Sequence, residues 1–232
     1  MKASELFTFP ESLPFRDFFS PEDAPWHWIA RIAEVLRAHD FSEAPPLPAT
    51  LPAGLRIQGP VYLDPSVSLP PYGCIEGPVW IGAGCTMRPG VYLRGNVIAA
   101  PGTVLGHCCE YKNCLLLEGV ETTHFNYIGD SVLGRGAHLG AGAICANLKL
   151  ARDEISVRLW DGERVPTGLT KFGALLGDGA EVACNTVLQP GTILGRNSAV
   201  LTSPFHGTLA ADSMALPEHS ANRSNRIIEK PA

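Results

Sequence analysis

The chain has 232 residues with 18 basic and 23 acidic side chains, and its length is enough to bury a substantial core. The net charge of -5 gives no reason to expect nucleic-acid binding. No apolar run approaches membrane-spanning length, and the first residues lack the apolar core of a signal peptide. We therefore expect a cytoplasmic protein.

The first predicted element is a helix close to the N-terminus. Apolar residues recur there at helical spacing, at Trp26, Ile29, Ala33 and Leu36. Pro25 suits the first turn of this helix, and a proline-rich segment follows over residues 41–54. We expect residues 1–50 to form a helical appendage that ends in a proline-rich linker.

A repeat of six residues begins at Ile57. Its apolar positions follow without a gap at Ile57, Leu63, Leu69, Ile75, Ile81, Met87, Leu93, Ala99 and Leu105. Four residues after each of them comes a small or β-branched residue, such as Val61, Val79 or Cys85. Neither the helical period nor plain strand alternation gives this pattern. It indicates a coiled parallel sheet in which three hexads make one coil and stacked coils share a core.

The hexad frame is interrupted twice. It breaks after Cys109 and resumes at Tyr127, then breaks again over residues 148–171 and resumes at Leu176. We expect both interruptions to be loops that leave the coil. The second alternates around an Asp-Gly turn signal, which predicts a hairpin arm directed to a ligand or a neighbouring subunit.

These patterns divide the chain into three parts. The repeat domain is expected over residues 51–203, with the loop insertion at 148–171. From about Pro204 the period is lost and the sequence becomes polar. Residues 204–232 are therefore expected to form a C-terminal tail or a subunit contact.

The stretch HFNYIGDSVLGRGAHLGAGAICANL, residues 124–148, carries a family resemblance. It resembles the acetyltransferase domain of the bacterial bifunctional N-acetylglucosamine-1-phosphate uridyltransferase/glucosamine-1-phosphate N-acetyltransferases. Archaeal sugar-1-phosphate nucleotidylyltransferases with the same C-terminal domain are similar too. The resemblance covers about residues 57–202. It implies an all-β fold, the left-handed parallel β-helix, here with a short N-terminal helical segment, and a homotrimer with sites between neighbouring subunits.

The resemblance also assigns catalytic residues. In the motif H-[apolar]-x-Y-[apolar]-G-D, the base of the family falls on His124 and its tyrosine on Tyr127. Upstream, EYKN supplies an acidic residue and a lysine at Glu110 and Lys112. His124 is thus the expected general base, and Glu110 is expected to orient the histidine or the substrate amine.

Binding residues follow in the same way. RPG matches the phosphate-binding arginine at Arg88, with Arg94 as the competing candidate because one extra hexad precedes Glu110. Arg88, Lys112 and Tyr127 are therefore expected to bind the acceptor.

The segment GAG-x-x-x-x-N places an acyl-donor-facing turn at Ala141 and an acceptor-contacting asparagine at Asn147. Cys184 lies where the family has a serine near the donor. The chain departs from the family at His138, where an asparagine is expected, and after Asn147, where the sequence LKLARDE is closer to the archaeal form. The identity of the sugar is therefore open.

N-acetyl transfer requires a base for the amine, donors for the developing oxyanion and cations for a substrate phosphate. The resemblance implies an acetyl-CoA-dependent N-acetyltransferase acting on an amino-sugar phosphate, or on a nucleotide-linked amino sugar, in UDP-N-acetylglucosamine biosynthesis. A nucleotidyltransferase half has no counterpart in the first 56 residues, so a separate chain is a possible partner. Basic residues between 149 and 196 either bind the nucleotide head of coenzyme A or solvate a loop.

Two other functions are considered. A non-catalytic trimeric module that binds a sugar nucleotide, or a separate nucleotidyltransferase, would use the N-terminal helix for docking. The γ-type carbonic anhydrases share hexad repeats, but their H-x-x-x-x-H zinc pair is missing here. The seven cysteines contain no C-x-x-C pair, so we predict no metal in the β-helix and regard them as small reduced core thiols.

Overall fold

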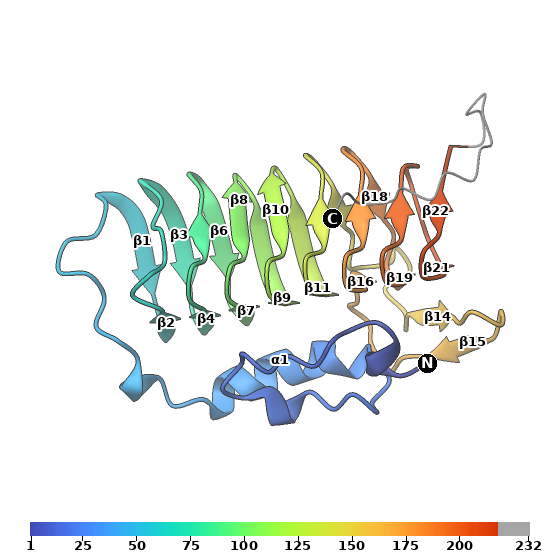
Figure 1. The fold of residues 1–232 in the computed structure, drawn as a ribbon, viewed down its shortest axis with the longest axis horizontal. Coiled ribbons are helices and arrows are strands. Elements are labelled where there is room, and N and C mark those ends of the chain that lie inside the picture. The colour runs from blue at the N-terminus through green and yellow to red at the C-terminus, as the bar shows by residue number, and fades with distance from the viewer. Residues whose placement is uncertain (218–232) are drawn as a thin grey trace.

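The computed structural model describes residues 1–217. Its main body is a left-handed parallel β-helix, in which short strands stack in successive coils along one axis (Figure 1). This is the fold predicted from the hexads and the family resemblance. We refer to the three flat sides of the prism as the first, second and third faces.

The strands of each face pair in parallel. The first face contains β1 (Gly54–Gln58), β3 (Tyr72–Glu76), β6 (Val91–Arg94), the first halves of β9 (Glu110–Leu116) and β11 (Tyr127–Leu133), β13 (Ile144–Cys145) and β18 (Val187–Leu188). The second face contains β2 (Val61–Leu63), β4 (Val79–Ile81), β7 (Val97–Ala99), the second halves of β9 and β11, β16 (Ala174–Leu176), β19 (Thr192–Leu194) and β21 (Thr208–Leu209). The third face contains β5 (Thr86–Met87), β8 (Val104–His107), β10 (Glu121–His124), β12 (His138–Leu139), β17 (Glu181–Val182), β20 (Ala199–Val200) and β22 (Met214–Ala215).

The hexad residues fill the inside of the prism. Ile75, Ile81, Leu93, Ala99 and Leu105 are all fully buried in one continuous core. The small sites of the frame, Val79, Cys85, Val91 and Val97 among them, point into the same core. The inward positions predicted from the sequence are confirmed, because one aliphatic and one small side chain per hexad fill the interior at native density.

The first interruption of the frame is not a loop, so that prediction is wrong. Early coils pair residues 18 apart, as in Gly73 with Val91, whereas Tyr111 pairs with Ile128, 17 residues later. One coil is therefore shorter by a residue, which shifts the frame without breaking the ladder. As a result, β9 and β10 occupy the segment expected to leave the prism.

The N-terminal segment packs along the outside of the second face. It contains the 3-10 turns η1 (Ala3–Glu5), η2 (Arg16–Phe18) and η3 (Phe41–Glu43) and the helix α1 (His27–Ala38), which runs lengthwise beneath the coils in Figure 1. The helix buries Trp28, Ile29, Ile32, Val35 and Leu36. They share a second apolar cluster with outward-facing residues of the second face, namely Trp80, Ile98, Leu115, Val132, Leu175 and Ile193. The helix thus has its apolar face covered by its own chain.

The predicted hairpin arm is present and also packs on its own chain. It consists of the antiparallel strands β14 (Ser156–Arg158) and β15 (Arg164–Pro166). Ile155 and Val157 are each 1% exposed and belong to the second apolar cluster. Trp160 of the arm donates its indole N–H to Glu5 at 3.3 Å. The arm therefore extends the cover of the second face.

The β-helix continues past the boundary predicted at residue 203. Thr208 pairs with Ile193, and Met214 pairs with Ala199, so β21 and β22 add a further partial coil. The later part of the expected tail, residues 218–232, lies outside the described residues. Within residues 1–217, no helix is long and apolar enough to cross a membrane.

Candidate active site

His124, the predicted base, is the last residue of β10, at the edge where the third face turns into the first. It pairs in the ladder with His107 of the preceding coil. Its Nε2 lies 3.5 Å from Nη1 of Arg88, which also reaches the carbonyl of Thr123 at 3.5 Å. His124 is thus held by a strand end and contacted by a cation, instead of being carried on a free loop.

Arg94, and not Arg88, lies beside Glu110. Its Nη1 donates to Oε1 of Glu110 at 2.5 Å on the outer side of the first face. Glu110 pairs in the ladder with Tyr92 and Tyr127, and within the described chain it makes no hydrogen bond to His124. The structure therefore separates Glu110 from His124, which it was predicted to orient: Arg88 contacts the histidine, and Arg94 contacts Glu110.

Two residues predicted to bind the sugar substrate, Lys112 and Asn147, meet on a residue that the sequence analysis did not select. Lys112 donates to both oxygens of Asp130, at 3.0 and 2.9 Å, and Asn147 donates to the same carboxylate at 2.5 Å. The pKa of the nearby Tyr127 hydroxyl is raised chiefly by burial and then by the charges of Asp130 and Glu110. Asp130 closes the H-x-x-Y-x-G-D motif, so its place in the motif was the available signal.

Ala141 and Cys184, the two residues predicted to face the acetyl donor, lie in line with His124 in the coils that follow it. The N–H of Gly142 donates to the His124 carbonyl at 2.9 Å, and the N–H of Asn185 donates to the Ala141 carbonyl at 2.8 Å. Ala141 and Cys184 therefore follow His124 in successive coils. Neither Ala141 nor Cys184 donates its own N–H to an acceptor in residues 1–217. Both amides remain available to a ligand.

Curated proteins with similar sequences support the resemblance. A GlmU bifunctional protein of Methanococcus vannielii is 29% identical over 178 residues, which are 75% of this chain and 42% of that protein. A bifunctional sugar-1-phosphate nucleotidylyltransferase/acetyltransferase of Sulfurisphaera tokodaii is 33% identical over 46% of this chain and 26% of its own length. The GlmU protein of Leifsonia xyli is 36% identical over 53% and 25%.

The chain resembles the GlmU-type acetyltransferases. It spans less than half the length of the curated relatives it matches. No protein-family model matches the chain. Among solved structures, a hexapeptide transferase family protein of Anaplasma phagocytophilum aligns at TM-score 0.29 and 15% identity, covering 69% of this chain and 76% of that one. The polysialic acid O-acetyltransferase OatWY aligns at 0.33 and 14%, covering 69% and 83%.

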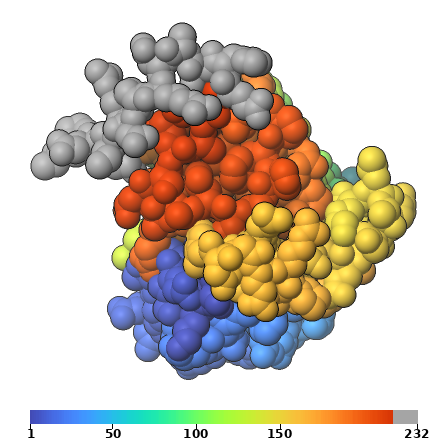
Figure 2. All heavy atoms as spheres, turned by 90° about the vertical axis from the view of Figure 1, so that its right-hand side faces the viewer, coloured from blue at the N-terminus to red at the C-terminus, as the bar shows by residue number. Residues whose placement is uncertain are grey.

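The loop between β13 and β14 follows Asn147 and projects from the side of the prism (Figure 2). Leu150 is fully exposed on this loop, and Phe125 next to His124 is 58% exposed. The basic residues expected to form a donor rim are partly neutralised, because Lys149 pairs with Asp153 and Arg196 with Asp178. The loop therefore presents apolar side chains, and two of the six basic residues of the expected rim are neutralised by ion pairs.

Residues 1–217 contain no cluster of three or more His, Cys, Asp or Glu side chains suited to a metal ion. His138 pairs with Glu121 at 3.4 Å and His107 contacts the Pro89 carbonyl at 2.8 Å. All seven cysteines are free thiols.

Proposed function

We propose that the chain is an acetyl-CoA-dependent N-acetyltransferase that acts on an amino-sugar phosphate or a nucleotide-linked amino sugar. The observation that carries this proposal is the column at the edge between the third and first faces, where Ala141 and Cys184 follow His124 in successive coils. The Lys112–Asp130–Asn147 cluster lies at the other end of the first face, where it turns into the second face. The names of the GlmU-type relatives support the same chemistry.

The proposed reaction begins with the acceptor amine, which attacks the thioester carbonyl while His124 removes its proton. A neutral imidazole is available for this role near neutral pH. The carbonyl oxygen gains negative charge in the transition state, and the N–H of Ala141 or Cys184 is free to donate to it. The tetrahedral intermediate then collapses, the thiolate of coenzyme A leaves, and the proton on His124 is returned to that sulfur.

Acceptor binding is assigned to the first face. Arg94 and Arg88 are the two cations that flank His124 and Glu110, and either guanidinium can bind a phosphate in a bidentate manner. Tyr127 and Asn147 are proposed to contact the sugar, as the resemblance implies. Glu110 is proposed to contact the amine or to hold Arg94.

We further propose that the active form is a homotrimer. The second face is already covered by α1 and the hairpin arm, so a neighbouring prism would meet the edge between the third and first faces. Exposed Phe125 and Ile144 lie at the start of the first face, next to that edge, and would be buried by a second copy. Sedimentation or mass photometry would measure the assembly directly.

The test of this function is thiol release from acetyl-CoA, measured across a panel of amino-sugar phosphates and nucleotide-linked amino sugars. We expect turnover with at least one acceptor and a single N-acetylated product. Binding of sugar nucleotides without turnover of any acceptor would contradict the enzymatic function and favour the non-catalytic binding module. That alternative has lost its main structural support, because the apolar face of α1 packs on the chain itself.

A further inference from the structure

Asp130 lies at the turn between the first and second faces and is almost completely buried, with 4% of its surface exposed. It accepts hydrogen bonds from three side chains, of which Lys112 and Asn113 come from the preceding coil and Asn147 from the following one. Lys112 donates at 3.0 and 2.9 Å, Asn113 at 2.9 Å and Asn147 at 2.5 Å. A buried carboxylate is stable only when such donors replace its hydration shell.

The backbone fixes where this carboxylate points. Asp130 has φ +46°, in the left-handed region that aspartate tolerates better than most residues. Its carbonyl accepts the N–H of Gly173 at 2.8 Å, which ties the turn to the coil that follows the hairpin arm. The side chain therefore leaves a rigid turn, and the groups that it binds are held relative to the prism.

Lys112 is oriented by this carboxylate. An ammonium group has three N–H donors, and two directions are already occupied by the oxygens of Asp130. The Lys112 side chain remains 25% exposed, so one donor is left for a ligand. Lys112 pairs in the ladder with Gly129, which has no side chain to deflect it.

Asn147 is oriented in the same way. Its amide nitrogen donates to Oδ2 of Asp130 and the amide also contacts the Tyr127 hydroxyl. A Cβ on Gly129 would lie 2.6 Å from that hydroxyl and 2.7 Å from the Asn147 nitrogen, so the glycine makes room for the pair. Asp130 thus links Lys112, Asn147 and, through Asn147, Tyr127.

We propose that Asp130 is the positioning residue of the acceptor site. It holds one N–H of Lys112 and the amide of Asn147 toward the amino sugar, and it compensates the charge of Lys112 so that the cluster is neutral before the acceptor binds. Asp130 does not touch the reacting atoms. The inference rests on the proposed function, since it assigns these partners to the acceptor.

The test compares Asp130→Asn with Asn197→Gly. The first keeps the volume but removes the charge, and it leaves Lys112 without its counter-ion. The second removes an asparagine that donates to a different carboxylate, that of Asp212, at a residue with φ +52°, which glycine adopts without strain. We expect Asp130→Asn to raise the KM for the acceptor about tenfold while the KM for acetyl-CoA is unchanged, and Asn197→Gly to leave both unchanged.

A purely structural role would give a different result. Loss of thermal stability in Asp130→Asn with an unchanged acceptor KM would overturn the proposal, as would an equal rise in both KM values. If Asp130→Asn does not fold, Asp130→Glu keeps the charge but displaces its oxygens, and the same selective loss for the acceptor is expected.

Direct binding separates this inference from the proposed function. Calorimetry with an amino-sugar phosphate alone needs no acetyl transfer. Weaker binding to Asp130→Asn than to the wild type supports the positioning role even if no acetyl group is ever transferred. Equal binding, or no binding to the wild type, contradicts it.

Discussion

Arg88 and His124 belong to different coils, yet Nη1 of Arg88 lies 3.5 Å from Nε2 of His124. A guanidinium has only donors, so a hydrogen bond between them requires the lone pair of the neutral imidazole on Nε2. The N–H of the ring is then on Nδ1. The acceptor amine would have to take the position of the Arg88 nitrogen when it approaches the base.

The two arginines are predicted to affect different kinetic constants. Arg88→Ala frees the ring of His124, so we expect kcat to fall about tenfold with little change in the KM for the acceptor. Arg94→Ala removes the partner of Glu110 at 2.5 Å, so it should raise the acceptor KM. Steady-state kinetics of both variants measures the two constants separately, and identical effects would contradict the different roles of Arg88 and Arg94.

The docking of the N-terminal helix is expected to contribute to global stability. Ile32 is fully buried between α1 and the second face, and truncation of such a residue leaves a cavity. We expect Ile32→Ala to lower the free energy of unfolding by about 2–4 kcal/mol in urea titrations. Arg37→Ala on the exposed side of the helix is the control and should change it by less than about 0.5 kcal/mol. A negligible effect of Ile32→Ala would mean that the segment is not docked in solution.

The hexad frame predicts the inside of the prism well, because one apolar and one small residue per hexad are what a narrow coil admits. The same frame fails between Cys109 and Tyr127. A coil shortened by one residue shifts every later position, which looks like an interruption in the sequence although β9 and β10 continue the ladder.

The helix and the hairpin arm that cover the second face could have been predicted from the outward residues of its strands, which the hexad count does not use. The strands there read VWI, VIA, CLL, SVL, ALL and TIL, so the outward middle residue is apolar each time. Strands buried on both sides have such continuous apolar runs. The sequence therefore predicts that the second face is covered by another part of the chain. The hydrogen bonds of Lys112 and Asn147 to Asp130 depend on contacts between coils, which residue spacing does not predict.

The cysteines are predicted to divide into two reactivity groups. Burial raises the pKa of the Cys85, Cys109 and Cys114 thiols, and it raises that of Cys145 to about 12. These thiols therefore stay protonated and unreactive at pH 8. Cys108 and Cys184 are exposed. Mass spectrometry after brief iodoacetamide treatment of the native protein should find label on Cys108 and Cys184 first, and early label on Cys114 would contradict the packed core.

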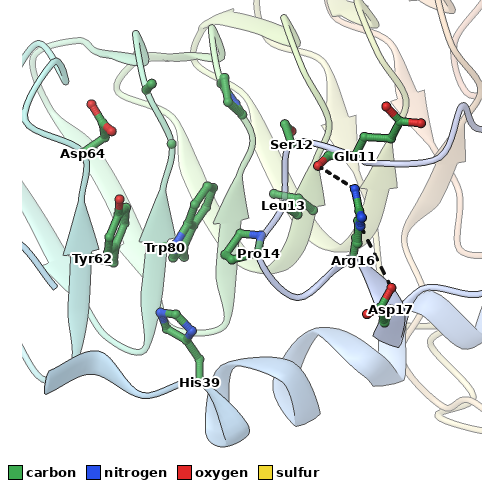
Figure 3. Close-up of a pocket in the computed structure, with 13 residues that line it drawn as sticks. Glu11, Ser12, Leu13, Pro14, Arg16, Asp17, His39, Tyr62, Asp64 and Trp80 are labelled. Atoms are coloured by element: carbon green, nitrogen blue, oxygen red, sulfur yellow. Dashed lines mark hydrogen bonds and ion pairs between the residues drawn. The ribbon is translucent and has the colours of Figure 1, made fainter. Parts of the chain in front are cut away.

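Stability should fall as the solution becomes acidic, in part because of His39. This residue lies among Phe15, Phe41 and Tyr62, next to a groove of about 650 Å³ between the N-terminal segment and the first coils (Figure 3). Its Nε2 is buried without a partner in residues 1–217, and burial lowers its pKa.

Because the folded pKa of His39 is below the unfolded one, the unfolded state binds the proton first. The contribution of the neutral His39 to the free energy of unfolding is thus fully present above about pH 6.5 and is lost as the pH falls through its lower folded pKa. We expect the melting temperature to drop between pH 7 and pH 5, and less so in His39→Phe. His27→Asn, on the exposed side of α1, should retain the full drop. An equal drop in all three proteins would remove His39 from the explanation.

The most direct test of His124 as the general base is the rate of acetyl transfer by His124→Ala with the best acceptor of the panel. His138→Ala, which removes a partly exposed histidine paired with Glu121, is the matched control. We predict a fall in kcat of roughly 10²–10⁴-fold for His124→Ala, the usual contribution of a general base, and near wild-type turnover for His138→Ala. Full activity of a folded His124→Ala would contradict the assignment of the base and with it the proposed site.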